Sequence, residues 1–322
     1  MQRNITLDYL KILLSFFVIL IHLRPFFKEG SEFIMFLGWE ITNSFTRIAV
    51  PCFFILNGYF LSKYMNNWKV VKKYALRILV IYTTWVLIYL SLYASLGYIE
   101  MSRVSILPII KGIVVGFDHL WYLNALIMTV LILFFLYKIH FINGLKGEVI
   151  LIIALFVIGY FVQCELLMER GGGYVMYSRN ALFIGIPFVL LGKIIKTYEE
   201  KIVNININVL YLFMFLSGIV LVLESYFAFT SKASLDIYLS LIILSPAVII
   251  YALKHSVFRS NDDNFKGMLA TAIYCSHGLI LTWVRTFPGH ISPFFQLPVI
   301  LFLTLCISMI VIELNKRVKI FI

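Results

Sequence analysis

The sequence predicts an all-α protein, a bundle of helices that crosses a membrane many times. Hydrophobic residues make up 61% of the 322 residues and charged residues only 13%, whereas soluble domains carry about 25% charged residues. The mean hydropathy is +0.95. The apolar residues form long stretches without the alternation of period two that marks the strands of a membrane β-barrel. Helices are therefore expected, because a helix satisfies its backbone hydrogen-bonding groups internally.

Ten apolar stretches are long enough to cross the hydrocarbon layer, for which about 20 helical residues suffice. In chain order they are residues 6–27, 42–62, 72–97, 119–138, 148–166, 180–197, 207–229, 235–254, 268–287 and 294–315. Short polar segments join them, and the sequence contains no repeat of fixed period. We therefore expect residues 1–322 to form a single transmembrane domain with no soluble domain appended.

The distribution of positive charge predicts the orientation. With the N-terminus inside, twice as many of the 27 Lys and Arg residues fall on the inner side as on the outer side. The positive-inside rule then places both termini in the cytoplasm. This topology explains the net charge of +11. No nucleic-acid partner is expected, because the cations lie between apolar runs and form no groove. The four cysteines lack metal-binding or disulfide spacing.

The first span carries ionisable residues on one face. Lys11 and His22 are eleven residues apart, which is about three helical turns and roughly 16 Å along the axis. Asp8 and Ser15 fall close to the same stripe. Charged groups within a span usually face the bundle interior and mark functional sites. The alternative is that Lys11 and His22 reach the two headgroup layers and merely anchor the helix ends.

Polar residues in three other spans are further candidates. Arg47, near the outer end of the second span, can stabilise an anion or oxyanion. His119 opens the fourth span beside Trp121 and Tyr122, although an aromatic belt at the membrane border would explain these two rings without chemistry. His277 lies in the middle of the ninth span, where a buried, hydrogen-bonded histidine is the plainer interpretation.

The strongest basic cluster, residues 63–77, follows the second span on the predicted cytoplasmic side. It serves topology and anionic lipid in one interpretation. In the other, Lys72, Lys73 and Arg77 bind phosphate groups of a ligand.

Other charged residues lie near the predicted outer surface. The carboxylates there are candidates to orient the imidazole of His22, and the sequence does not choose among Glu224, Glu165, Asp118 and Glu40. Arg170 and Arg179, in an outer loop, are candidates to contact a sugar ligand.

Four sequence blocks, in order along the chain, resemble motifs of the acyltransferase family 3 membrane proteins. Lys11 and His22 match the R/K-X10-H motif of its first helix. The block "RIAVPCFFILNGYFL", from Arg47 to Leu61, resembles the signature R-x-x-VP-x-FF-x-x-SGY, with Asn57 where serine is usual. "HLWYL", which begins at His119, is similar to the H-x-W-F/Y-L block, and "IYCSHGLIL", which contains His277, resembles the late Y-x-x-H helix. The resemblance covers essentially the whole chain.

This resemblance implies a membrane O-acetyltransferase in a bacterial-type cytoplasmic (inner or plasma) membrane. Acetyl-CoA would be the donor, and a hydroxyl group of a surface polysaccharide or glycolipid precursor would be the acceptor. The implied catalytic residues are His22, Arg47 and His119, and the implied CoA-binding residues are Lys11, Lys72, Lys73 and Arg77. No permanent cofactor or metal is expected, and the oligomeric state is not readable from the sequence.

Two other functions stay open. Some relatives with this architecture are thought to move a small molecule such as an amino acid, and the stripe from Asp8 to His22 would serve equally as a proton or substrate path. Such a transporter would work without acyl-CoA. A purely structural membrane scaffold is the third function, and it explains the motifs poorly.

Overall fold

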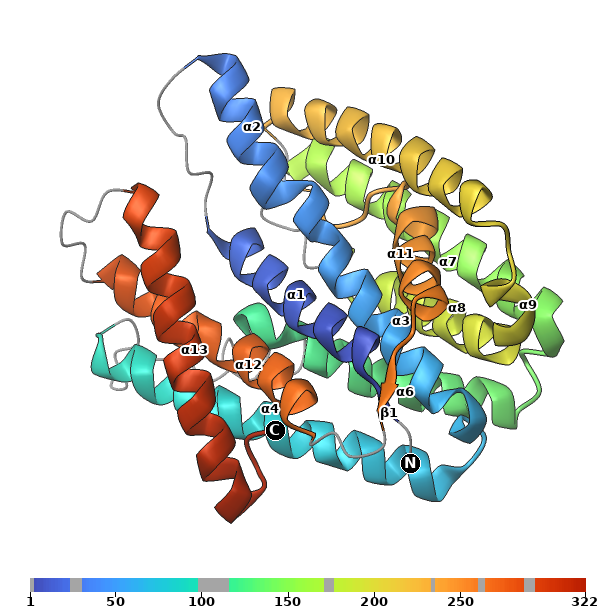
Figure 1. The fold of residues 1–322 in the computed structure, drawn as a ribbon, viewed down its shortest axis with the longest axis horizontal. Coiled ribbons are helices and arrows are strands. Elements are labelled where there is room, and N and C mark those ends of the chain that lie inside the picture. Colours follow the sequence, from blue (N-terminus) through green and yellow to red (C-terminus); the bar gives the residue numbers. More distant parts are fainter. Residues whose placement is uncertain are drawn as a thin grey trace.

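The structure is a computed structural model that describes residues 3–23, 31–97, 116–170, 177–232, 235–259, 264–286 and 293–322. Within these ranges the chain is a helix bundle, as predicted, with one antiparallel pair of two-residue strands (Figure 1). Strand β1 (Arg3–Asn4) pairs with β2 (Phe258–Arg259). This pairing ties the N-terminal end of the described chain to the segment just before Phe265.

The helical elements follow one another with short connections. In chain order they are α1 (Ile5–His22), α2 (Glu32–Asn43), η1 (Phe45–Ile48), α3 (Ala49–Leu61), η2 (Ser62–Tyr64), α4 (Trp68–Ser95), η3 (Asp118–Leu120), α6 (Trp121–Lys138), α7 (Gly144–Arg170), η5 (Ala181–Gly185), α8 (Ile186–Thr197), α9 (Glu199–Val203), α10 (Ile207–Thr230), α11 (Leu241–Lys254), α12 (Phe265–Thr286) and α13 (Pro293–Val318). Asparagine side chains cap several of them; at the start of α1, Asn4 Oδ1 accepts a hydrogen bond from the amide of Leu7.

Eight helical stretches in the described parts of the chain are long and apolar enough to cross a membrane. The predicted spans 180–197 and 235–254 correspond to shorter helices, η5 with α8 and the 14-residue α11. The count of ten spans and the cytoplasmic placement of the termini stay predictions. Residues 24–27, which end the first predicted span, lie outside the described residues.

Helix α2 has no counterpart among the predicted spans. Residues 28–41 lie between the first two of these spans, whereas the structure makes Glu32–Asn43 helical. The Ser31 side chain caps its start by accepting a hydrogen bond from the amide of Ile34. The helix continues through η1 into α3, so that Glu32–Tyr64 forms one apolar stretch of 33 residues.

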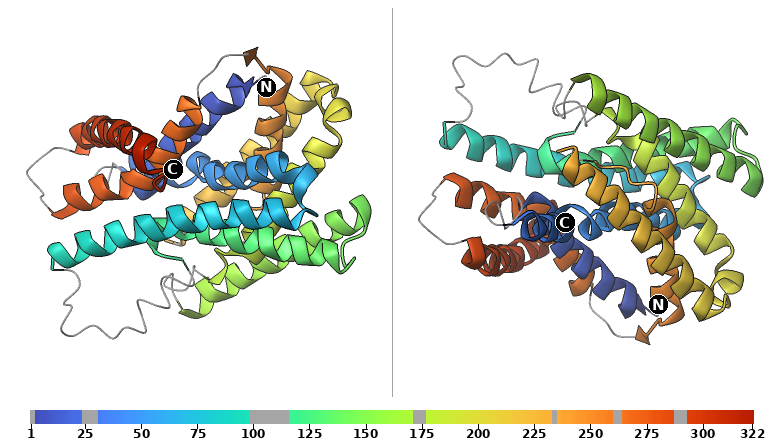
Figure 2. Two further views of the ribbon diagram at one scale, coloured as in Figure 1. Left: turned by 90° about the horizontal axis from the view of Figure 1, so that it is seen from below. Right: turned by 90° about the horizontal axis from the view of Figure 1, so that it is seen from above.

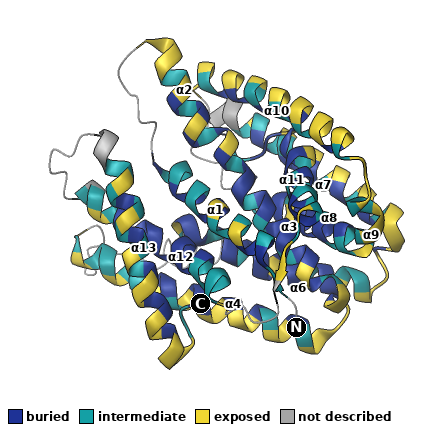
Figure 3. Ribbon diagram, viewed as in Figure 1, coloured by how far each residue is buried: buried dark blue, intermediate teal, exposed yellow. Residues whose placement is uncertain are grey.

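The outer surface of the bundle is apolar. Figure 3 shows exposed residues along the outward faces of α4, α10 and α13. On α10 these include large side chains such as Phe213, Phe215 and Leu223. An apolar surface of this extent suits contact with lipid, which agrees with a multi-pass membrane protein.

Helix α1 lies within the bundle. It packs against α12 on one side and against α3 on another (Figure 1). Two further views show α12 and α13 side by side next to α1 (Figure 2). Asp8 and Ser15 on its polar stripe are buried, whereas Tyr9 and Leu13 on α1 are exposed, so the polar stripe faces protein.

Helices α3 and α8 approach one another until their backbones touch. A Cβ atom on Gly58 would lie 1.9 Å from the carbonyl oxygen of Val189, and one on Gly192 would lie 1.9 Å from that of Ile55. No rotamer relieves a contact with backbone, so both positions require glycine. Helix α3, which directly follows the η1 turn that carries Arg47, is thereby fixed against α8.

We expect Gly58→Ala to destabilise the protein by about 1–3 kcal/mol, because the added methyl group forces α3 away from α8. The thermal unfolding midpoint in detergent measures this. Gly218→Ala on α10 is the matched control, since a Cβ atom there meets nothing within 4 Å. Equal midpoints for the two variants would contradict the backbone contact.

Candidate functional site

Three histidines from three distant segments meet inside the bundle. His22 ends α1, His119 lies in η3, and His277 lies in α12. The ring centroids of His119 and His277 are 4.7 Å apart, and His22 lies 5.4 Å from His277 and 6.1 Å from His119. His119 and His277 are buried. The structure therefore assembles one imidazole cluster from three residues that the sequence predicted separately.

The backbone of α12 fixes the tautomer of His277. Its Nδ1 lies 2.6 Å from the carbonyl oxygen of Tyr274 and 3.3 Å from that of Ile273. A carbonyl oxygen only accepts, so Nδ1 carries the hydrogen and Nε2 carries a lone pair. His277 Nε2 is buried without a hydrogen-bond partner among the described residues. It is available to accept a proton or a hydrogen bond from a ligand.

His119 has a carboxylate beside it. Asp118 Oδ2 lies 3.6 Å from His119 Nδ1 and accepts a hydrogen bond of 2.8 Å from the hydroxyl group of Tyr93. Asp118 has a φ angle of 45°, in the left-handed region that few non-glycine residues adopt. Among the described residues, His119 Nε2 is buried and has no hydrogen-bond partner. The segment thus holds an acid–imidazole pair against the cluster.

Helix α12 also positions His119. The hydroxyl group of Tyr274 donates a hydrogen bond of 2.7 Å to the carbonyl oxygen of His119. A Cβ atom on Gly278 would lie 2.4 Å from His119 Cε1 and 2.7 Å from the hydroxyl oxygen of Tyr89. The missing side chain of Gly278 makes the room that the imidazole occupies.

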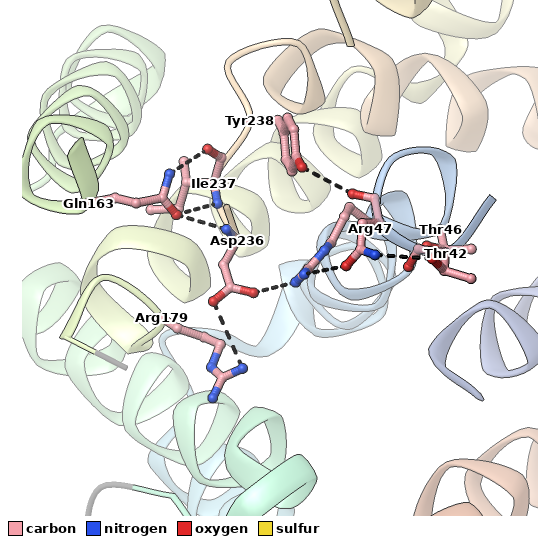
Figure 4. Close-up of polar contacts among 9 residues, drawn as sticks. Thr42, Thr46, Arg47, Gln163, Arg179, Asp236, Ile237 and Tyr238 are labelled. Atoms are coloured by element: carbon pink, nitrogen blue, oxygen red, sulfur yellow. Dashed lines mark hydrogen bonds and ion pairs between the residues drawn. The ribbon is translucent and has the colours of Figure 1, made fainter. Parts of the chain in front are cut away.

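A cavity of about 50 Å³ adjoins the histidines, and we call it the outer cavity. Its lining includes His22, His119, Arg47, Trp121, Arg179 and Asp236. The guanidinium group of Arg47 pairs with Asp236 Oδ1 and donates to Asn43 Oδ1 at 3.3 Å (Figure 4). Arg47 therefore lies in the outer cavity with an ionic partner 189 residues further along the chain.

A larger cavity of about 380 Å³, the inner cavity, is lined by Lys11 and by two other cations, Arg3 and Arg77. Lys11 Nζ lies 3.2 Å from Asp8 Oδ1, and Asp8 also pairs with Arg3. Three cations with one carboxylate give this cavity a positive lining. Lys11 thus opens onto one cavity and His22 onto the other.

The two cavities share a wall. Tyr122 and Tyr274 line both of them. Asn57 Nδ2 donates a hydrogen bond of 2.6 Å to the hydroxyl oxygen of Tyr122, and Asn57 Oδ1 accepts one from the hydroxyl group of Tyr74. Asn57 therefore braces the tyrosine partition between the cavities.

Several predicted residues lie elsewhere. Lys72 and Lys73 are exposed on α4 and are not among the residues that line the inner cavity. Glu224 accepts hydrogen bonds from the amides of Leu239 and Ser240, at 2.7 and 3.0 Å, and so fixes the start of α11.

The two remaining candidate carboxylates do not line the outer cavity. Glu165 is exposed on α7 and Glu40 is buried in α2, and neither is among the residues that line the outer cavity. The side chain of Arg170 lies outside the described residues.

Sequence reasoning missed two residues that line the cavities, Arg3 and Asp236, and one residue that supports Asp236, Gln163. Arg3 precedes the first predicted span, and its cationic side chain was the available signal. For Asp236, the available signal was an acidic residue at the start of the predicted span 235–254, where it could pair with Arg47. Gln163 had no signal, because its role is to bind the backbone of residues 236 and 237. Within the described residues, no group of three or more His, Cys, Asp or Glu side chains is arranged to hold a metal ion.

Comparison with known proteins gives a family and two relatives. The family model described as an acyltransferase domain matches residues 4–313. Two curated relatives from Enterococcus faecalis are each named amino-acid racemase. One is 31% identical over 202 residues, which cover 58% of this chain and 27% of the relative. The other is 28% identical over 312 residues, which cover 88% of this chain and 42% of the relative.

The chain thus spans less than half the length of either relative. No solved structure matches.

We expect Gly278→Ala to displace His119 from the cluster, since the new methyl group overlaps the imidazole and the Tyr89 hydroxyl. The imidazole signals of protein labelled with ¹⁵N-histidine measure this, with His119→Ala assigning the signal that moves. Gly218→Ala is again the control. Unchanged signals in the Gly278 variant would show that the ring has another place to lie.

Proposed function

This chain belongs to the acyltransferase family, and from that premise we propose that it moves an acetyl group across a membrane. The donor is acetyl-CoA on the cytoplasmic side, and the acceptor is a hydroxyl group of a surface polysaccharide or its lipid-linked precursor on the other side. The observation that supports this most is the pair of cavities that meet at Tyr122 and Tyr274. Lys11 lines the inner cavity and His22 the outer one.

The inner cavity suits the nucleotide end of the donor. Arg3, Lys11 and Arg77 bring three cations to its lining, and cations of this kind bind phosphate groups through charge-assisted hydrogen bonds. Its volume of about 380 Å³ falls in the range of ligand pockets, about 300–1,000 Å³. The pantetheine arm then runs past the tyrosine partition toward His22. The length that it has to span is roughly 16 Å, the separation of Lys11 and His22 along α1.

The histidine cluster suits the transfer itself. An imidazole nitrogen of His22 takes the proton of the acceptor hydroxyl group, and the oxygen attacks the thioester carbonyl carbon. The new carbon–oxygen bond forms, the carbon–sulfur bond breaks, and the proton passes to the CoA sulfur. Arg47, held in the outer cavity by Asp236, stabilises the negative charge that builds on the carbonyl oxygen. A route through an acyl group carried on His22 uses the same residues.

His119 and His277 support His22 in this scheme. Each presents a buried Nε2 atom without a partner among the described residues, within ring contact of His22. Asp118 next to His119 stabilises a proton that arrives on that ring. We therefore assign the two rings the task of holding the transferred proton close to the reacting oxygen.

Transport of an amino acid or another small polar metabolite is the second candidate function. Its support is the pair of adjacent cavities together with the two relatives named amino-acid racemase. Uptake of radiolabelled amino acids into vesicles that contain the protein, without any acyl-CoA, distinguishes transport from acyl transfer. Uptake that needs no donor would favour transport.

We expect His22→Ala and Lys11→Ala each to abolish the O-acetyl signal of purified surface polysaccharide, measured by NMR at matched membrane expression. Loss of a general base costs about 10²–10⁴-fold in rate. His255→Ala and Lys201→Ala, at exposed positions, are the matched controls. An O-acetyl signal that persists after deletion of the whole gene would remove this polymer as the acceptor.

The donor site makes a separate prediction for purified protein. We expect Arg3→Gln and Arg77→Gln to raise the KM for acetyl-CoA by about 10–100-fold, the effect of losing a charged hydrogen bond. The KM for acetyl-pantetheine, which lacks the nucleotide phosphates, should not change. Lys72→Gln and Lys73→Gln, on the exposed face of α4, test the sequence-based assignment of those lysines. A larger effect of these two variants would place the phosphates outside the inner cavity.

A further inference from the structure

The described lining of the outer cavity carries more fixed positive charge than negative charge. Arg47 enters from η1, and Arg179 from the segment just before η5. Asp236 lies between the two guanidinium groups (Figure 4). One carboxylate cannot neutralise two guanidinium groups, which stay protonated in proteins. A net positive charge therefore remains beside His22.

The two arginines share Asp236 unequally. Arg47 is in direct contact with Asp236 Oδ1, and its side chain is only 11% exposed. Arg179 Nη1 lies 3.8 Å from Asp236 Oδ2, too far for a hydrogen bond, and its side chain is 31% exposed. The excess charge is therefore concentrated on Arg179.

Neighbouring groups keep both partners in place. Gln163 is 1% exposed; its Oε1 accepts hydrogen bonds from the amides of Asp236 and Ile237 at 2.8 and 2.9 Å, and its Nε2 donates one to the carbonyl oxygen of Ile237 at 2.8 Å. The guanidinium group of Arg179 lies over the ring of Trp121, 5.2 Å from its centroid. A fixed carboxylate and an aromatic face thus hold the Arg179 guanidinium at the edge of the cavity.

We propose that Arg179 binds an anionic group of the acceptor, a carboxylate or a phosphate, close to the hydroxyl group that is acylated. A guanidinium group matches both anions with two parallel hydrogen bonds. The cavity volume of about 50 Å³ exceeds the roughly 10–15 Å³ that a cavity needs to hold one water molecule, so a small polar group fits. Asp236 is the positioning residue that keeps Arg47 and Arg179 apart.

Arg179 forms a binding site for anions whatever the reaction is. The identification of the anion as part of the acceptor rests on the proposed function. A negatively charged group next to His22 would fix which hydroxyl group reaches the imidazole. Neutral sugars lack that group and would lose one charged hydrogen bond. Their Kd should therefore be about 10–100-fold higher.

The test measures thermal unfolding of the purified protein in detergent with sodium formate, sodium phosphate or sodium chloride at equal ionic strength. Formate and phosphate represent the two sources of the anionic group. We expect at least one of them to raise the unfolding midpoint by about 2 °C over chloride at about tenfold excess over its Kd. Arg179→Gln should remove this rise, and Arg179→Lys should reduce it, since lysine keeps the charge without the paired hydrogen bonds.

Two controls separate this site from others. Arg317→Gln, at an exposed arginine near the end of α13, should respond as the wild type does. Arg77→Gln removes phosphate bound in the inner cavity and should leave the Arg179-dependent part of the rise. An Arg179→Gln variant that responds as Arg317→Gln does, or a wild type that responds to neither anion, would overturn the proposal. No acyl donor is present, so failure here is distinct from failure of acyl transfer.

Discussion

A charge without a partner is very costly in the interior of a lipid bilayer, and this constraint governs where the polar groups of the bundle lie. The apolar surfaces of α10 and α13 face outward. The ionisable residues of α1 face other helices, where Asp8 pairs with both Arg3 and Lys11. Arg47 is neutralised by Asp236 in the same way. Both cavities form where the bundle gathers these groups, so the position of the chemistry follows from the solvation of charge.

Residues that share one element were predictable from the sequence, because helical periodicity alone decides which side chains lie on one face. Lys11 and His22 illustrate this: the predicted stripe is real, and its two ends open onto two cavities. The meeting of His22 with His119 and His277 was not predictable, because it depends on how α1, η3 and α12 pack. The same holds for Arg47 and Asp236, which are 189 residues apart.

The helix-bundle class was predictable from hydropathy, whereas short helices were harder to interpret. Helices α8 and α11 have 12 and 14 residues, fewer than the roughly 20 that cross the hydrocarbon layer. Helix α2 was missed because its polar residues, such as the buried Glu40, interrupt the apolar run. Neighbouring residues of a helix point in directions about 100° apart, so the cations of the basic cluster cannot all face one cavity. Arg77, Lys72 and Lys73 are all exposed, but of the three only Arg77 lines the inner cavity.

The tyrosine partition has an electrical consequence. A continuous polar path through a membrane bundle would leak protons and ions, and moving one elementary charge through a potential of 100 mV releases about 2.3 kcal/mol. Tyr122, held by Asn57, and Tyr274, held by the carbonyl oxygen of His119, stand at the place where the cavities meet. These hydrogen bonds keep the two rings in place as a barrier between the cavities. Any ligand that reaches from one cavity to the other has to pass these two rings.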